Sequence, residues 1–189
     1  MGTLDDLFHR FEHLNDIGAS LSNERDLGRL LEKIVVAAKS ITRADGGTLY
    51  LLSEDKRHLH FEIVRTDSLN IAFGGTSGNP VSGKFPDLPL YRDDGTPNDT
   101  MIAAYAAISG QTVNIADAYV AKGFDFSGTR KFDERNGYRS QSFLTVPMRN
   151  HEGEIIGVLQ LINAHMPRHD VVVPFSEADQ RLAESLASQ

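Results

Sequence analysis

Two apolar runs near the C-terminal end limit the folds that this chain can adopt. Residues 142–148 and 155–162 are rich in Phe, Leu, Val, Ile and Thr, and the turn-prone segment 150–153 (NHEG) separates them. This pattern predicts an antiparallel β-hairpin. Only Gly157 and Gln160 interrupt the apolar residues of the second run, which indicates a strand that is buried on both faces. We therefore expect this hairpin at the centre of a sheet that carries helices on both sides.

The size and charge of the chain exclude several classes of protein. A chain of 189 residues with 40% hydrophobic content can bury one sizeable core, whereas a second independent domain would be cramped. The net charge of −7 argues against nucleic acid as a partner, because a phosphate backbone requires a basic surface. The sequence has no apolar run of membrane-spanning length and no signal-peptide pattern. We therefore expect no membrane partner and a cytoplasmic location.

The N-terminal segment, residues 1–22, predicts a helix. Its apolar residues recur at alternating three- and four-residue steps, which is a heptad pattern. We interpret it as a dimerisation helix that forms a parallel homodimer. The alternative is a helix that packs on its own domain, because fewer than three heptads are short for a coiled coil. The heptad positions are Leu4, Leu7, Phe11, Leu14 and Leu21, with Gly18 at the remaining one.

The next segments predict a cover helix followed by two strands. Asn23 and Asp26 mark a helix start, and helical spacing of apolar residues continues from there to Ile41. The segment 45–47 (DGG) is expected to end this helix as a turn. Residues 48–52 then predict a first strand, and alternation at 59–63 predicts a second strand.

Residues 67–98 are rich in glycine and proline and show little periodicity. Loops of this length within a domain tend to be functional lids or disordered segments. Residues 78–84 match the spacing G-x-x-x-x-G-K, but Phe85 stands where a phosphate loop requires Ser or Thr, and Pro80 interrupts the loop. We therefore interpret 67–98 as a loop insertion and not as a phosphate site.

The remaining segments alternate between short helices and strands. Residues 100–109 predict a helix that ends at Gly110, and residues 112–115 predict a strand. Residues 131–136 predict a helical turn that Gly137 ends. A capping box at 176–179 starts a final helix, 176–189, which is expected to be a connector to a partner or else a terminal packing helix.

Several of these segments resemble the GAF domain, a small-molecule sensor module of signalling proteins. The resemblance lies in GYRSxSxLxVPM (137–148) and GVLQLIN (157–163), with a further similar segment at 107–118. The chain looks most like the GAF domains found ahead of bacterial HD-GYP phosphodiesterases and nucleotide cyclases. The resemblance implies an α/β (α+β) fold with a central antiparallel sheet of about six strands. The sensor domain would then comprise residues 23–175.

The resemblance also implies a regulatory function and no catalysis by the domain itself. Ligand occupancy would be transmitted through the terminal helices to a C-terminal effector, such as an HD-domain phosphohydrolase or a cyclase. The ligand would be a cyclic nucleotide or another small molecule, and no cofactor is required. The alternative is a ligand-free dimerisation and connector module. A third hypothesis, a stand-alone enzyme, ranks last because no recognised catalytic motif is present.

The absence of cysteine narrows the family functions. Bilin attachment and the thiol reductases built on this fold both use cysteine, and the sequence contains none. The seven histidines form pairs without a third ligand at a recognised offset. We therefore predict no metal site and no catalytic residue.

GAF domains that bind cyclic nucleotides carry an Asn-Lys pair followed by a Phe, three residues and Asp-Glu. Here Ala164 replaces the Lys and Gln180 replaces the Glu, so the family's Lys–Asp ion pair cannot form. The matching positions are Asn163, Phe175 and Asp179. If they do not bind a ligand, Asn163 would end a strand, Phe175 would fill the core and Asp179 would cap a helix.

The segments that would surround a ligand offer hydroxyl, amide, aromatic and charged side chains. Arg139 is the strong anion partner among them, with an ion pair to Asp133 as the structural alternative, and Asp117 is an acceptor for an amine or hydroxyl. The predicted ligand-binding residues are Asn114, Asp117, Phe124, Phe126, Thr129, Arg139, Ser142 and Thr145.

Overall fold

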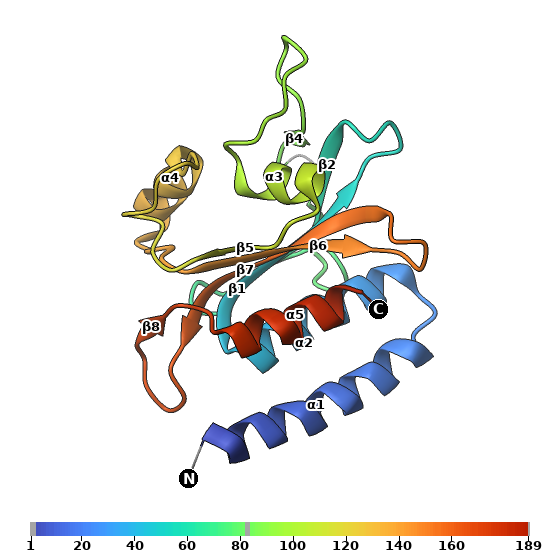
Figure 1. The fold of residues 1–189 in the computed structure, drawn as a ribbon, viewed down its shortest axis with the longest axis vertical. Helices are drawn as coiled ribbons and strands as arrows, with labels where there is room; N and C mark the ends of the chain where they lie inside the picture. Colours follow the sequence, from blue (N-terminus) through green and yellow to red (C-terminus); the bar gives the residue numbers. More distant parts are fainter. Residues whose placement is uncertain (1–2, 82–83, 189) are drawn as a thin grey trace.

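The computed structural model describes residues 3–81 and 84–188, apart from the side chains of residues 3, 4, 7, 8 and 11. The described residues form five helices and eight strands (Figure 1). In chain order they are α1 (Thr3–Asn23), α2 (Leu27–Thr42), β1 (Ala44–Leu52), β2 (His58–Thr66), β3 (Ile71–Phe73), β4 (Leu88–Pro89), α3 (Ile102–Ser109), β5 (Val113–Ile115), α4 (Ser127–Asn136), β6 (Phe143–Arg149), β7 (Ile155–His165), β8 (Val172–Val173) and α5 (Glu177–Ala187).

The strands form one antiparallel sheet with the order β3-β2-β1-β7-β6-β5. The predicted hairpin is confirmed, since β6 and β7 pair over their length, and β1 pairs with the other edge of β7. The sheet therefore has the expected six strands along its main path. Two strands of two residues each, β4 and β8, add to β2 and β7 at its margins.

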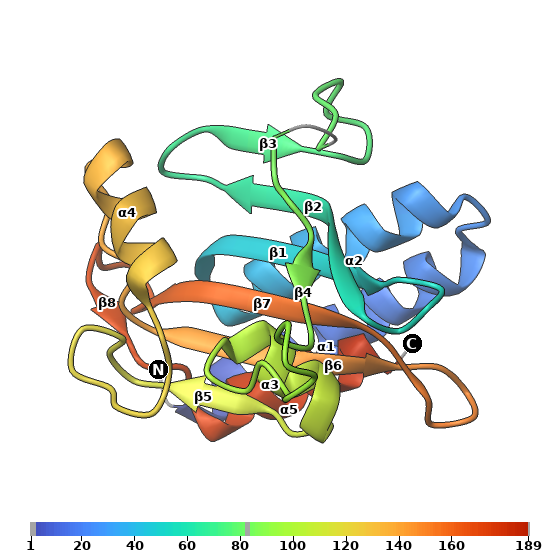
Figure 2. The same cartoon turned by 90° about the horizontal axis from the view of Figure 1, so that it is seen from above.

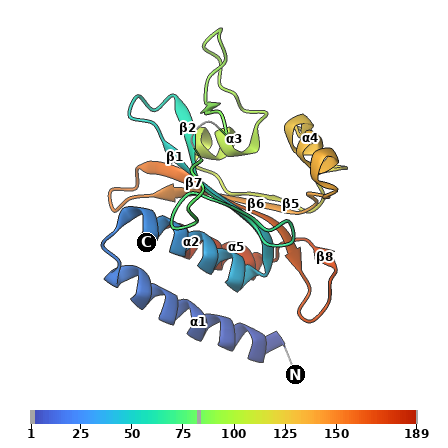
Figure 3. The same cartoon turned by 180° about the vertical axis from the view of Figure 1, so that it is seen from behind.

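Both faces of the central strands are covered, as the apolar run in β7 predicts. Helices α2 and α5 pack on one face with α1 outside them, and α3 and α4 lie over the other face (Figures 1 and 3). Leu49, Leu159 and Leu161 point to the α2 and α5 layer and are fully buried there. Tyr50 and Val158 point to the opposite layer and pack with α3.

The junction between α2 and β1 differs from its prediction. Segment 45–47 does not end the helix, because Arg43 already does so in the left-handed conformation (φ 58°) and β1 begins at Ala44. The two glycines are instead part of the strand. A Cβ atom on Gly47 would lie 2.9 Å from Val35 Cγ1, so a glycine at this position lets α2 pack close to the sheet.

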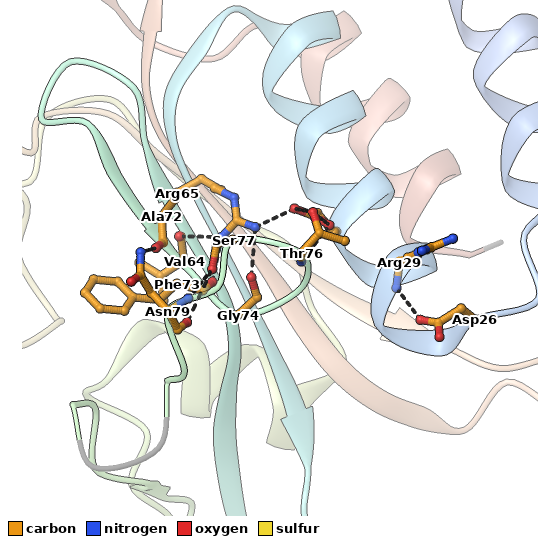
Figure 4. A network of polar contacts seen from close by, with 11 residues as sticks. Asp26, Arg29, Val64, Arg65, Ala72, Phe73, Gly74, Thr76, Ser77 and Asn79 are labelled. Carbon is orange, nitrogen blue, oxygen red and sulfur yellow. Dashed lines mark hydrogen bonds and ion pairs between the residues drawn. The ribbon is translucent and has the colours of Figure 1, made fainter.

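The start of the 67–98 segment is fixed to the sheet and to α2 (Figure 4). The guanidinium of Arg65 donates to the carbonyl oxygens of Phe73 (2.6 Å) and Gly74 (3.1 Å) and to Glu32 (2.7 Å). The hydroxyl of Thr76 donates to the same carboxylate. This end of the predicted loop is therefore an ordered strand and turn rather than a free lid.

Helix α1 is confirmed as a helix, and part of it packs on its own domain. Leu21 is buried in the main core, and Leu14 and Ile17 pack against that core. The side chains of Leu4, Leu7 and Phe11, which complete the predicted heptad pattern, lie outside the described residues. In the part of the chain that the structure describes, no helix is long and apolar enough to cross a bilayer.

A substitution at Gly157 would test how tightly β1 and β7 are packed. A Cβ atom at this position would lie 2.2 Å from the carbonyl oxygen of Tyr50, so we expect Gly157→Ala to lower the free energy of unfolding by about 1–3 kcal/mol. The matched control is Gly18→Ala, where nothing lies within 4 Å of the added carbon. Because alanine favours a helix, the control should gain about 0.5–1 kcal/mol. Urea unfolding measures both, and a neutral Gly157→Ala would contradict the packing described.

Candidate functional site

A cavity of about 320 Å³ lies on the face of the sheet that α3 and α4 cover. Strands β1, β2, β6 and β7 form its floor, and α4 and Phe85 of the 67–98 segment bound its sides. Figure 2 looks onto this face, with α4 over one end of the sheet. The volume is at the lower end of the range for small-molecule sites, which is roughly 300–1,000 Å³.

Aromatic rings make up much of the cavity wall. The Tyr50 and Phe61 ring centroids are 4.6 Å apart, and Phe61 and Phe85 stack at 5.0 Å. These rings pack directly on one another, tilted by 51° and 28°, and together form an aromatic wall. The rings that line the cavity belong to Tyr50, Phe61, Phe85, Phe132, Tyr138 and Phe143.

Three polar side chains cross the floor on neighbouring strands, and we call them the polar row: Thr66, Thr48 and Gln160. Thr145 follows Gln160 on β6 but is fully buried and does not line the cavity. Thr48 is opposite Gln160 in the pairing of β1 with β7, and Gln160 is opposite Thr145 in the next pair. Thr66 lies diagonally from Thr48, two residues beyond its partner Val64. The Gln160 amide nitrogen lies 3.1 Å from the Thr145 hydroxyl, and its oxygen lies 3.4 Å from the Tyr50 hydroxyl. Among the described residues, neither the Thr48 nor the Thr66 hydroxyl has a hydrogen-bond partner.

Asp45 joins two segments that border the cavity. Its carboxylate accepts hydrogen bonds from the Tyr138 hydroxyl (2.7 Å) and from the Ser68 hydroxyl (2.6 Å) and backbone N–H (2.9 Å). Burial raises the pKa of Asp45, but these hydrogen bonds outweigh it and hold the pKa below the ordinary value. Burial, together with the bond to Asp45, raises the pKa of Tyr138 far above the ordinary range. The phenol is therefore neutral and donates to a charged carboxylate.

No charged side chain lines the cavity within the described part of the chain. One carboxylate stands beside it: Asp125 lines an adjoining hollow of about 90 Å³, which shares Tyr50, Thr129 and Gln160 with the cavity. Asp125 Oδ1 accepts from the Ser127 N–H at 2.9 Å, and this bond holds the pKa of Asp125 below the ordinary value. A negative charge thus already occupies the N-terminus of α4.

The structure brings two of the predicted ligand-binding residues, Phe126 and Thr129, to the wall of this site. Thr129 lines both the cavity and the adjoining hollow, and Phe126 lines the hollow with its ring 5.7 Å from that of Phe143. Thr145, in the middle of β6, is fully buried and contacts the site only through its hydrogen bond with the Gln160 amide.

The other five predicted residues lie away from the cavity wall. Asn114 donates to the backbone of Phe175 at 3.1 Å, and the Ser142 hydroxyl accepts from the Ala164 N–H. The remaining three are held locally. Asp117 accepts from the Tyr119 N–H, Phe124 packs edge-on against Tyr105, and the Arg139 guanidinium lies 4.0 Å from the Tyr119 ring centroid. In the described part of the chain, Asp133 bonds to Tyr119 and Ser140 and not to Arg139.

Two of the three motif residues have the structural roles expected of them, whereas Asn163 does not end its strand, because β7 continues to His165. Asn163 accepts from the N–H groups of Gln141 and Ser142 and donates to the Arg139 carbonyl, which fixes the approach to β6. Phe175 is buried in the main core. Asp179 forms the capping box of α5 and also an ion pair with Arg10 of α1. Asp179 is therefore paired with a cation from α1.

Sequence reasoning missed most of the cavity floor. Thr48, Thr66 and Gln160 are polar residues of three different strands, and Gln160 stands out as a break in an apolar run. A polar side chain on a strand buried on both faces needs a partner or a ligand, which was the available signal. Tyr138 carried no such signal, since its role depends on Asp45, which is 93 residues away.

Comparison with known proteins places the chain in a family. A family model described as GAF domain matches residues 26–189. The chain is 28% identical over 163 residues to a cGMP-specific 3',5'-cyclic phosphodiesterase of Drosophila sechellia, a match that covers 81% of this chain and 12% of that protein. For the same enzyme of Drosophila mojavensis the identity is 29%, with 81% and 13% covered. The chain thus spans about an eighth of the length of these relatives.

Solved structures share the fold. The GAF domain of an Acinetobacter phosphoenolpyruvate-protein phosphotransferase superposes with a TM-score of 0.66 at 18% identity, covering 100% of this chain and 90% of that one. The free methionine-R-sulfoxide reductase of Neisseria meningitidis superposes with a TM-score of 0.61 at 18% identity, covering 94% and 83%.

The bond between Tyr138 and Asp45 can be tested without a ligand. Tyr138→Phe removes a hydrogen bond to a charged carboxylate, so we expect a loss of about 1.5–3 kcal/mol in the free energy of unfolding at pH 7. Because the bond depresses the pKa of Asp45, its contribution is complete above the ordinary value of 3.8 and is lost as the pH falls through the lower folded value. The loss should therefore shrink in acid.

Urea unfolding from pH 7 downward measures this difference, with Tyr91→Phe as the control. No hydrogen bond of the Tyr91 hydroxyl occurs among the described residues, so the control should match the parent. A loss that stays constant with pH would show that Tyr138→Phe acts through packing alone.

Proposed function

The chain belongs to the GAF domain family, and we propose that it is a small-molecule-sensing domain of a signalling protein, with the ligand in the cavity described above. GAF domains are regulatory sensor domains of signalling proteins. The observation that carries the proposal is a cavity of about 320 Å³ whose floor has unpartnered hydroxyl groups. Unpartnered polar groups inside an aromatic cavity favour binding of a molecule that satisfies them.

The layout of the sheet supports coupling between the cavity and the terminal helices. Strands β1 and β7 face the cavity with Tyr50 and Gln160 and face α2 and α5 with Leu49 and Leu159. A ligand that moves Tyr138 also changes the bond to Asp45. Such a ligand would favour one arrangement of the cavity walls, and α1 and α5 would transmit this preference to an effector in the full-length protein by a shift of populations.

Cyclic nucleotides are the ligand class that the relatives suggest, because those relatives are named as cGMP-specific phosphodiesterases. The effector by the same comparison is a phosphodiesterase or another enzyme of cyclic-nucleotide signalling. This chain departs from the motif of cyclic-nucleotide-binding GAF domains, because Asp179 pairs with Arg10 and not with a motif lysine.

A dimerisation and connector module without a ligand is the second candidate. It is supported by the exposed apolar side chains of Leu27 and Val36 on α2, beside a groove between α1 and α2 that His13 and Leu21 also line. Under this alternative the cavity stays empty and the domain only holds two copies in register. A stand-alone enzyme has less support. The solved reductase shows that a GAF-like fold can serve an enzyme, but this sequence has no cysteine.

A ligand screen tests the sensing function. A compound present at about a hundred times its Kd should raise Tm by roughly 5–10 °C. Gly128 lines the cavity, and nothing lies within 4 Å of an added Cβ atom, so Gly128→Leu should fill the space and abolish the shift. Glu134→Leu, an exposed position on the same helix, is the matched control and should keep it. A shift that survives Gly128→Leu would place the ligand elsewhere.

The homodimer is tested by crosslinking, because the chain has no native cysteine. A parallel dimer through the predicted heptad positions of α1 would place the two Gly18 residues opposite each other and would require Leu14 and Leu21 to exchange their contacts with the domain's own core for contacts with the partner. Gly18→Cys should then give a disulfide-linked dimer under oxidation. Glu12→Cys, on an exposed position of α1, should crosslink much less. Non-reducing gels and sedimentation velocity measure both variants. A monomer in solution with no crosslinking would contradict dimerisation through α1.

A further inference from the structure

We infer that the cavity selects an uncharged, flat heteroaromatic molecule of nucleobase or nucleoside size and discriminates against its phosphorylated form. This inference rests on the proposed sensing function and names the chemistry of the ligand for the same site. It follows from the hydrogen-bonding groups of the floor, the shape of the walls and the charges around the cavity.

The polar row supplies hydrogen bonds along one line. The Thr48 and Thr66 hydroxyls can each donate and accept, and neither has a partner among the described residues. Gln160 is held in place by Thr145 and Tyr50, which leaves one amide hydrogen and one lone pair of its carbonyl oxygen for a ligand. An edge with alternating donors and acceptors, such as that of a heterocyclic base, matches this row. An aliphatic ligand would leave these groups unsatisfied, which is unfavourable.

The walls favour a ring. Tyr50, Phe61 and Phe85 form a continuous aromatic surface, with ring centroids 4.6 Å and 5.0 Å apart in succession. Phe143 and Ile162 line the other side of the polar row. A planar heterocycle with its polar edge on the row would contact this aromatic wall on one side and Phe143 on the other.

The charges around the site exclude a phosphate. No charged side chain lines the cavity in residues 3–81 and 84–188, and burial raises the pKa of Tyr50, which keeps that phenol neutral. The amides at the start of α4, beside Gly128 and Thr129, are the natural place for an anion. The Asp125 carboxylate already binds there, through the Ser127 N–H. Lys131, the cation that acts on Asp125, does not line the cavity.

Matched pairs of compounds test the inference by isothermal titration calorimetry. Adenosine and guanosine are compared with cyclic AMP and cyclic GMP, and adenine and hypoxanthine serve as bare bases. An uncompensated phosphate beside a carboxylate is costly, so at least one uncharged compound should bind about tenfold or more tightly than its cyclic nucleotide. The wider compound screen proposed above is run on the same protein.

Two conservative variants test the polar row and the Asp125 charge separately. Thr48→Val keeps the branched shape and removes one hydroxyl, so it should weaken the uncharged ligand roughly three- to tenfold. Thr112→Val, outside the cavity, is the control and should bind as the parent does. Asp125→Asn keeps an acceptor for the Ser127 N–H and removes the charge. It should strengthen cyclic-nucleotide binding roughly two- to tenfold and leave the uncharged compound unchanged.

The outcomes distinguish this inference from the proposed function. Cyclic nucleotides that bind as tightly as the nucleosides, or an Asp125→Asn variant without a selective effect, would overturn the inference and leave the sensing function intact. Binding only by a compound of another class in the screen would do the same. If no compound binds at all, both the inference and the sensing function fail. Circular dichroism of each variant confirms that it is folded.

Discussion

The pairing of β1 with β7 holds the rest of the structure in place. The two strands pair closely enough that Gly157 leaves no room for a side-chain carbon against the Tyr50 carbonyl. Alternate residues along each strand then point to opposite layers. Leu49 and Leu159 fill the helical layer, while Tyr50 and Gln160 face the cavity. The same pair of strands therefore carries the core of the domain on one face and the floor of its candidate site on the other.

Because the floor of the cavity belongs to the central strands, only its walls come from α4 and the 67–98 segment. A floor made of central strands is rigid, so the parts that can differ between states are the walls from α4 and the 67–98 segment. Asp45 bonds to Tyr138 after α4 and to Ser68 at the start of that segment. One carboxylate of β1 thus contacts both the segment that follows α4 and the turn that begins the 67–98 segment. A sensor needs such a contact, because a ligand shifts an equilibrium only through interactions that differ between the two states.

The sequence predicted those features that depend on neighbouring residues. The hairpin around residues 150–153, the ends of α3 and α4 at glycine, and the capping box of α5 each follow from a short local pattern. The end of α2 was misplaced because Arg43 took the left-handed conformation that glycine usually takes, and the glycines after it serve close packing. The site was harder to predict, because its floor combines residues from four strands that are far apart in the sequence. Of the eight predicted ligand contacts, Thr129 on α4 and Phe126 at its N-cap lie at the cavity or the adjoining hollow, while loop residues such as Arg139 are exposed.

The ion pair between Arg10 and Asp179 has a consequence for where this domain begins. The family match starts at residue 26, yet Leu21 is only 4% exposed within the main core and Arg10 holds the first turn of α5. A fragment trimmed to the family boundary would lose both contacts and expose apolar surface on α2 and α5. The evolutionary unit and the physical unit therefore differ by about one helix, and the shorter one would be a poor choice for expression or crystallisation.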